Sequence, residues 1–198
     1  MPRGYRLGER AAAMEATRTR ILEAGAQLYA ERGISATTMR EIGERADVAP
    51  GTLRNHFASR ERLDQAMVDW LRLEGPLPEL SIFEGAMTIE DRLRRLFVAA
   101  QAFFVSAARI YRMWLREPML TKPWQVAGAQ YGQRWDALMR SALGPLADDE
   151  QAVAVLRAVL QPPFFERITA DGRSNEETVD LVSAVVGPWF AGRLAARR

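Results

Sequence analysis

The chain has 198 residues, of which 48% are hydrophobic and 26% are charged, a composition typical of a folded globular protein and not of a disordered one. It has no cysteine and one histidine, which excludes disulfides, iron–sulfur clusters, cysteine nucleophiles and the common zinc sites. We therefore expect no metal and no other cofactor. The formal net charge is +2, and every basic residue except Lys122 is arginine. Arginine suits bidentate phosphate contact, although this ratio alone identifies no partner.

Nothing in the sequence indicates export or membrane insertion. Residues 1–20 are rich in arginine but contain no apolar core of the signal-peptide kind. No apolar run approaches the ~18 residues that a membrane span requires. A cytoplasmic location is therefore expected by elimination. Arg3, Arg6 and Arg10 are expected in an unstructured tail, with an arm that reaches the DNA minor groove as the alternative.

Apolar residues recur at three- and four-residue steps along nearly the whole chain, which predicts an all-α fold. The first helix is expected over residues 17–32, ended by Gly33. Thr38 and Glu41 form a capping box that opens a second, short helix. A third short helix begins at Ala49, with a proline in its first turn where the missing N–H does no harm.

Ser59 is expected to cap a fourth, longer helix, which ends at the Gly-Pro-Leu-Pro stretch of residues 75–78. This stretch is the clearest boundary signal in the chain. Five more helices are expected over residues 88–106, 111–116, 122–143, 147–161 and 174–197.

Residues 38–57 have the spacing of a helix-turn-helix. Ile42 and Leu53 anchor the two helices, Asp47 lies in the turn, and the small Gly43 stands where the helices approach closely. Such a unit presents the exposed face of a short helix to the DNA major groove, which is wide enough for one helix. Any two short crossing helices can share this spacing, so spacing alone leaves DNA binding and plain packing both open.

Four stretches in this region carry a family resemblance. They are TRILEA at residues 19–24, GISATT at 33–38, VAPGTL at 48–53 and HFASRE at 56–61, followed by Leu63. Together they resemble the N-terminal domain of the TetR/AcrR family of bacterial transcription regulators, over about residues 17–70. The resemblance implies a three-helix helix-turn-helix domain over residues 1–62. It also implies a linking helix and a larger helical domain over residues 63–198 that binds a small effector and dimerises.

Two positions depart from the family pattern. Asp47 stands where the family usually has a glycine, and aspartate tolerates the positive φ that such a turn needs. Arg54 replaces the usual tyrosine, which commonly contacts a phosphate. Arginine can bind the same phosphate with added charge, so the mode of contact changes.

The resemblance also implies a set of DNA-binding residues. They are Thr38, Arg40, Pro50, Gly51, Thr52, Arg54, Asn55, His56 and Arg60. Arg40 would read a guanine through bidentate contact, while Thr38, Arg54, His56 and Arg60 would hold phosphates. The alternatives are a solvated surface charge for Arg40 and a structural role for His56.

The second half of the chain supplies candidates for two further roles. Aromatic residues suggest an effector pocket, with ordinary core packing as the alternative: Phe103, Phe104, Tyr111, Trp114, Trp124, Tyr131 and Trp135. By resemblance, the last two predicted helices form a dimer interface, with an intramolecular core as the alternative: Val155, Leu156, Val159, Val182, Val186 and Trp189.

These features predict a homodimeric, sequence-specific DNA-binding regulator, namely a repressor that a small effector releases from a pseudo-palindromic operator. Double-stranded DNA, the effector and a second copy are the expected partners. The alternative is a ligand-binding or interaction protein that has lost specific DNA binding, and Arg54 is its only support. No nucleophile–base pair or carboxylate cluster recommends an enzyme. Residues 1–62 hold 11 arginines and 8 acidic residues, so the small basic surplus lies with the helix-turn-helix.

Overall fold

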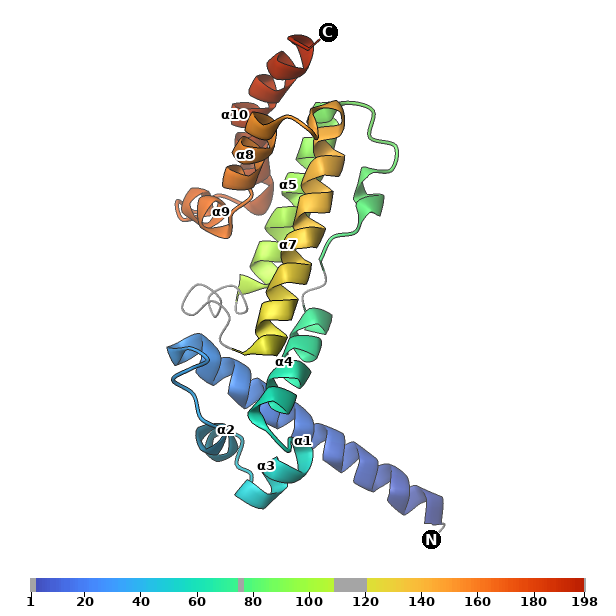
Figure 1. Cartoon of the computed structure of the whole chain (residues 1–198), viewed down its shortest axis with the longest axis vertical. Helices are drawn as coiled ribbons and strands as arrows, with labels where there is room; N and C mark the ends of the chain where they lie inside the picture. Colours follow the sequence, from blue (N-terminus) through green and yellow to red (C-terminus); the bar gives the residue numbers. More distant parts are fainter. Residues whose placement is uncertain (1–2, 75–76, 109–120, 198) are drawn as a thin grey trace. The chain divides into compact units, whose positions relative to one another are not determined.

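A computed structural model describes residues 3–74, 77–108 and 121–197 of the chain. Within these ranges every regular element is a helix, which confirms the predicted all-α class (Figure 1). The chain divides into two compact units: residues 1–74 with 108–128, and residues 75–107 with 129–198. Each unit is described by itself below.

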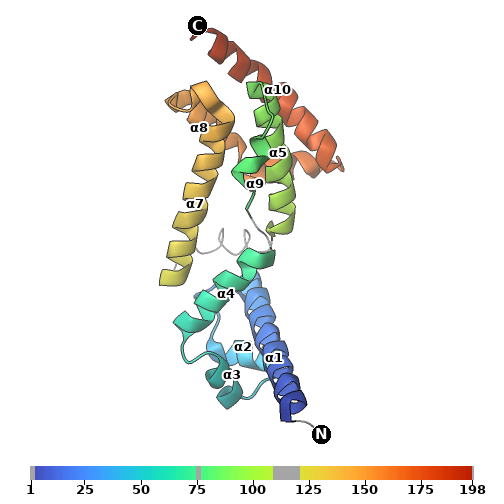
Figure 2. The ribbon, with the colours of Figure 1, turned by 90° about the vertical axis from the view of Figure 1, so that its right-hand side faces the viewer.

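The first unit contains the predicted helix-turn-helix (Figures 1 and 2). Its helices are α1 (Arg3–Arg32), α2 (Met39–Arg45), α3 (Pro50–His56) and α4 (Arg60–Glu74). All four agree with the predicted ends within a residue or two, except for the start of α1. Gly33, with a φ of 93°, ends α1 in the left-handed conformation that glycine adopts most easily.

The unstructured N-terminal tail was a wrong prediction, because α1 begins at Arg3 and not near residue 17. The residues from Gly8 to Ala16 are exposed, so this part of the helix buries no face. Its alanine-rich stretch has high intrinsic helix propensity. Periodicity reveals a helix only where one face is buried, which begins near Ile21.

The core of the first unit lies between α1, α2 and α4 and includes the start of another helix. Ile21, Leu28, Ile42, Leu63 and Met67 are fully buried there. Trp124 and Ala127, in the first turns of α7 (Lys122–Leu143), are buried as well and belong to the same unit. Packing therefore groups all of α4 and the start of α7 with the helix-turn-helix, whereas the predicted boundary fell after residue 62.

The second unit contains the remaining helices. They are η1 (Leu80–Phe83), α5 (Ile89–Ser106), the rest of α7, η2 (Gly144–Leu146), α8 (Glu150–Val159), α9 (Pro162–Thr169) and α10 (Asn175–Ala195). The predicted helices over residues 88–106, 122–143 and 174–197 are confirmed, with Thr88 and Ser174 as N-caps. The predicted helix over residues 111–116 lies outside the described residues.

Helix α9 is an element that the sequence analysis missed. The helix predicted over residues 147–161 ends before Pro162 and Pro163, but Pro162 also begins a new helix. A proline fits the first helical position, because the N–H that it lacks has no partner there. The core of this unit is formed by apolar side chains of α5, α7, α8, α9 and α10. None of the described helices is long and apolar enough to cross a membrane.

Candidate nucleic-acid interface

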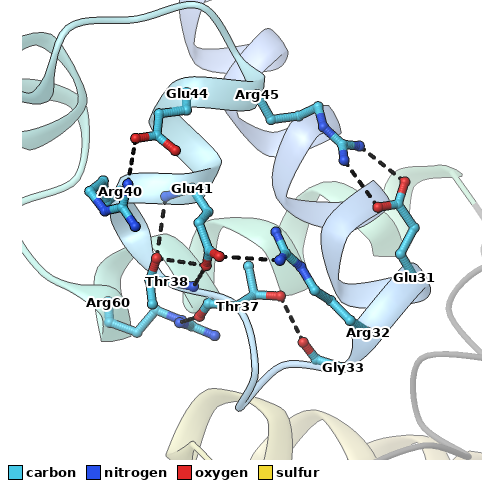
Figure 3. A network of polar contacts seen from close by, with 10 residues as sticks. All are labelled: Glu31, Arg32, Gly33, Thr37, Thr38, Arg40, Glu41, Glu44, Arg45 and Arg60. Atoms are coloured by element: carbon cyan, nitrogen blue, oxygen red, sulfur yellow. Dashed lines mark hydrogen bonds and ion pairs between the residues drawn. The ribbon is translucent and has the colours of Figure 1, made fainter.

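Helix α2 begins at the predicted capping box (Figure 3). The Glu41 carboxylate accepts from the Thr38 backbone N–H at 2.8 Å and from the Thr38 hydroxyl at 2.7 Å. The Glu41 N–H in turn donates to the Thr38 hydroxyl oxygen at 3.3 Å. The hydrogen bonds from Thr38 lower the pKa of Glu41, so the carboxylate stays ionised and the start of α2 is fixed.

Two ion pairs connect α2 to α1 (Figure 3). Arg45 donates from both terminal nitrogens to the Glu31 carboxylate at 3.0 Å, and Arg32 donates to Glu41 at 3.1 Å. The hydrogen bonds from Arg45 lower the pKa of Glu31. A bidentate arginine–carboxylate pair fixes orientation better than a single contact does. Neither pair follows from the local sequence, since the partners lie on different helices.

The turn from α2 to α3 has the predicted geometry. Asp47 has a φ of 53°, the positive value that glycine supplies at this position in the family pattern. A Cβ on Gly43 would lie 3.3 Å from a methyl carbon of Leu53, so the helices cross closely at this glycine. The Val48 N–H donates to the Gly43 carbonyl at 3.0 Å. These contacts fix α3 against α2.

Most of the predicted DNA-binding residues lie on the outer surface of this helix pair. Pro50, Gly51, Arg54 and Asn55 are exposed on α3, while Thr52 and His56 are half-buried. A Cβ on Gly51 would meet no atom of the chain within 4 Å. The protein's own packing therefore does not require glycine at this position.

Arg40 is exposed on α2, with 73% of its side chain accessible. Its guanidinium donates to Glu44 at 2.7 Å (Figure 3), a pair one helical turn apart. Exposed pairs of this kind contribute little to stability, so exchanging Glu44 for another acceptor costs little. Arg40 is therefore free to reorient toward a ligand.

Two predicted phosphate ligands already have hydrogen-bond partners within the chain. The Thr38 hydroxyl is part of the capping box. Arg60 donates from Nε to Asp64 at 3.0 Å and from its two terminal nitrogens to the carbonyls of Thr37 and Ile34 at 2.6 and 2.7 Å. The phosphate role predicted for Arg60 is thus not the one that its geometry favours.

Asp64 and Tyr29 are structurally important residues that the sequence analysis overlooked. Asp64 is fully buried and accepts a 2.5 Å hydrogen bond from the Tyr29 hydroxyl. One signal was available: Asp64 shares the buried face of α4 with Met67 and Leu71, three and seven residues later. An acid in an apolar stripe indicates a buried polar partner.

The structure brings four of the predicted effector-site aromatics together. Phe103 packs against Tyr131 and Trp135, with ring centroids 6.2 and 5.5 Å apart, and Phe104 packs against Trp135 at 5.7 Å. Trp124 does not join this cluster, because it is buried in the first unit and packs edge-on against Tyr29. The predicted residues Tyr111 and Trp114 lie outside the described residues.

The predicted dimer residues divide into two groups. Leu156, Val159, Val182 and Val186 belong to the core of the second unit, so the intramolecular alternative holds for them. Val155 is half-buried and packs against that core. Trp189 is 40% exposed, and two α10 residues that were not predicted, Leu181 and Val185, are 41% and 65% exposed. Because α10 is apolar on both faces, periodicity could not show which face points inward.

Comparison with known proteins identifies the helix-turn-helix unit. Residues 21–67 match the family described as bacterial regulatory proteins, tetR family. The chain is 36% identical over 87 residues to the HTH-type transcriptional repressor KstR2 of Mycobacterium tuberculosis, a match that covers 42% of each protein. It is 42% identical over 52 residues to the HTH-type transcriptional regulator UidR of Escherichia coli, over 26% of each. The matches thus span less than half the length of these curated relatives.

Solved structures extend the likeness to most of the chain, but as fold alone. NalD, the secondary repressor of a multidrug efflux pump in Pseudomonas aeruginosa, aligns with a TM-score of 0.60 at 21% identity, over 90% of this chain and 95% of that one. A HlyIIR mutant aligns with the same TM-score at 16% identity, over 86% of this chain and 95% of its own. Residues 21–67 therefore carry the signature of the tetR family of bacterial regulatory proteins, and the likeness beyond them is one of fold.

Proposed function

We propose that the protein is a homodimeric transcription repressor that binds a specific DNA operator and leaves it when a small effector binds. The observation that carries the proposal is the surface of α2 and α3. Arg40, Arg54 and Asn55 are exposed on two helices whose crossing is fixed by close packing at Gly43. A rigid helix pair with exposed arginine and amide side chains suits the major groove, where these groups bind bases and phosphates.

The residues of this surface have different parts in the proposal. Arg40 reads a base edge, because arginine forms a bidentate contact with guanine. Arg54 and His56 hold the phosphate backbone, and Asn55 adds a base or backbone contact. Pro50, Gly51 and Thr52 lie next to the DNA, where Gly51 allows close approach because its Cα carries no side chain. A regulator with this role works in the bacterial cytoplasm.

A second copy of the chain is the proposed occupant of the exposed apolar face of α10. Leu181, Val185 and Trp189 follow one another at four-residue steps and so lie on one side of the helix. Isolated exposed apolar residues are ordinary, but three large ones in a row favour an interface. A two-fold axis through this face would pair it with itself and place two helix-turn-helix units on a pseudo-palindromic site.

The aromatic cluster of α5 and α7 is the proposed effector site, with Phe103, Phe104, Tyr131 and Trp135 as its described members. All four are half-buried, so their rings are not completely covered by the protein. Aromatic side chains favour an apolar or flat ligand. Such a ligand releases DNA only if it binds the DNA-incompetent conformation more tightly than the competent one.

Selection of bound genomic fragments tests the proposed function directly. Purified protein is incubated with fragmented genomic DNA at low and at physiological salt, and the retained fragments are sequenced. We expect one pseudo-palindromic motif, whose retention falls steeply as salt rises, because phosphate contacts release counterions. A folded protein that retains no fragment at low salt would instead support the ligand-binding alternative. The genes beside the motif would then guide the search for the effector.

A further inference from the structure

The first unit contains a buried carboxylate, Asp64, with three hydrogen-bond donors around it. Its Oδ1 accepts from the Tyr29 hydroxyl at 2.5 Å and from Arg60 Nε at 3.0 Å. Its Oδ2 accepts from the Thr121 hydroxyl at 2.9 Å. Burial and the neighbouring Asp64 raise the pKa of Tyr29 well above its ordinary value, so this hydroxyl keeps its proton and always donates. A buried charge persists only with such partners, so these four side chains belong together and are called the Asp64 cluster.

Asp64 orients the guanidinium of Arg60. With Nε bound to Asp64, the two terminal nitrogens point to the carbonyls of Thr37 and Ile34, at 2.6 and 2.7 Å. The guanidinium also lies over the Tyr29 ring, 4.9 Å from its centroid. All three nitrogens of the guanidinium therefore have acceptors inside the protein. Only the planar fork of arginine can reach three acceptors in this arrangement.

The two carbonyls belong to the loop between α1 and α2, and Figure 3 shows Thr37 in this loop. Thr37 is buried, and its hydroxyl donates to the Gly33 carbonyl at 2.8 Å. The next residue, Thr38, is the N-cap of α2, and Arg40 lies in the first turn of that helix. The position of the Thr37 carbonyl therefore sets where α2 begins and where Arg40 projects.

The start of α7 is attached to the same cluster. The Thr121 carbonyl accepts from the Gln125 N–H at 3.1 Å, so Thr121 stands at the first turn of α7. One turn further, Trp124 packs edge-on against Tyr29, with ring centroids 6.3 Å apart. Thr121, directly before α7, thus contacts Asp64, and Trp124 in the first turn of α7 contacts Tyr29. A displacement of the start of this helix would therefore also displace Asp64 and Tyr29.

We propose that Arg60 is a positioning residue for DNA binding. Held by Asp64, Arg60 binds the Ile34 and Thr37 carbonyls and thereby fixes the position of α2. Through the hydrogen bond from Thr121 to Asp64, the position of α2 also depends on the first turn of α7. The inference rests on the DNA-binding function proposed above. The positioning role differs from direct phosphate contact by Arg60. Phosphate contact would require the guanidinium to move away from Asp64, which would then be buried without its charged partner. Removing one member of a buried pair is strongly destabilising.

Arg60→Lys separates the two roles, because lysine keeps the charge but has a single nitrogen. A phosphate ligand would tolerate this exchange, since lysine binds phosphate as a point charge. A positioning residue would not, since lysine cannot reach three acceptors. We expect operator affinity to fall about tenfold, the effect of losing one hydrogen bond between charged groups. Amide hydrogen exchange of residues 37–42 should become faster in the protein without DNA. Arg62→Lys, at an exposed position on the same helix, is the matched control.

Thr121→Val tests the connection to α7 with a smaller disturbance, because valine has the shape of threonine without its hydroxyl. We expect faster amide exchange at residues 37–42 and weaker operator binding than in the wild type, with a smaller loss than for Arg60→Lys. Thr169→Val is the control, since that hydroxyl bonds only to carbonyls of its own helix. Thermal melting of each variant verifies that the binding measurement is made on folded protein.

The outcomes are distinct. Unchanged operator affinity in Arg60→Lys, or reduced affinity without a change in amide exchange, would overturn the positioning role. Unchanged exchange in Thr121→Val would overturn the dependence on α7. Because exchange is measured without DNA, a wild-type protein that binds no operator would refute the proposed function, while the exchange data still decide whether Arg60 holds the start of α2.

Discussion

The helix pair α2–α3 and the helix α10 both present exposed surfaces, but the chemistry of the two surfaces is opposite. The first carries Arg40, Arg54 and Asn55, whereas the second carries Leu181 and Val185. Charged and amide groups are stable in water and can exchange it for a polar ligand. Large apolar groups gain free energy when they are covered. The difference supports the two proposals made above: the first surface binds DNA, and a second copy of the chain covers the other.

The two surfaces also differ in how they are held. Helix α2 is fixed by named polar contacts, from the capping box to the pairs Arg45–Glu31 and Arg32–Glu41. Helix α10 is held mainly by the apolar side chains of its inner face, such as Val182 and Phe190. Polar contacts are directional and fix a short helix to a defined position. Apolar packing is less directional and tolerates substitution if volume is kept.

The largest expected effect comes from placing charge on the apolar face of α10. In a variant with Leu181→Glu and Val185→Glu, like charges would meet across the two-fold axis, so we expect a monomer in sedimentation. Operator affinity should fall by about 100-fold or more, because the two half-sites are then no longer bound by one particle. Val98→Glu with Val105→Glu, at exposed valines of α5, is the control. A double variant that stays dimeric would place the interface elsewhere.

Arg40→Ala tests the polar surface at its predicted base contact. We expect operator binding to weaken by ~1–3 kcal/mol, the usual value of a good bidentate base contact. Binding to random DNA should change much less, and preference at one base position should relax. Glu44→Ala removes only the partner of Arg40 and should leave operator binding intact. Equal losses on operator and random DNA would reduce Arg40 to a phosphate contact.

Gly51→Ala asks whether the backbone of α3 lies against DNA. The added methyl group meets no atom of the protein within 4 Å, so thermal stability should not fall. If α3 contacts DNA at this position, the methyl group should weaken operator binding by ~1 kcal/mol, the lower end of the usual cost of overpacking. Gly132→Ala, at an equally open glycine of α7, should have no effect on binding. Full operator affinity in Gly51→Ala would show that α3 does not approach the DNA there.

The smallest effect concerns the second unit and leaves DNA binding unchanged. Arg193 binds the Asp149 carboxylate at 2.6 and 2.8 Å and holds its pKa at about 2, below the ordinary 3.8. Because this pKa is lower in the folded state, the ionised carboxylate stabilises the fold at every pH above the pKa of the unfolded state. This stabilisation is lost as the pH falls from about 4 to about 2. Asp149→Asn should therefore lower the denaturation midpoint at neutral pH, and the deficit should shrink on acidification. Asp148→Asn, at an exposed aspartate, should show no such trend.

The sequence predicted the local features well, because each depends on neighbouring residues. The capping box at Thr38, the turn at Asp47 and the close approach at Gly43 are all confirmed. Helix α9 was not predicted, because Pro162 begins it directly after the predicted end of another helix at residue 161. A proline fits both positions, and local sequence cannot decide between them.

Residues distant in the sequence decided the rest. Arg60 was predicted to bind phosphate, but its neighbours include Tyr29, 31 residues earlier, and the carbonyls of Ile34 and Thr37. Trp124 was grouped with the effector aromatics, but it packs in the first unit against Tyr29. Both cases have one cause: a side chain's partners depend on which helices pack together.

The amino-acid sequence was sufficient to predict the all-α class, the helix-turn-helix and the charge of that surface. These follow from spacing, capping and composition, which are properties of a short stretch of chain. The packing of the helices was needed to establish which apolar face of α10 is exposed and that Asp64 lies buried beside Arg60 and Thr121. Burial and pairing arise when distant helices pack, and packing determines which polar groups have partners and which surfaces remain open to a ligand.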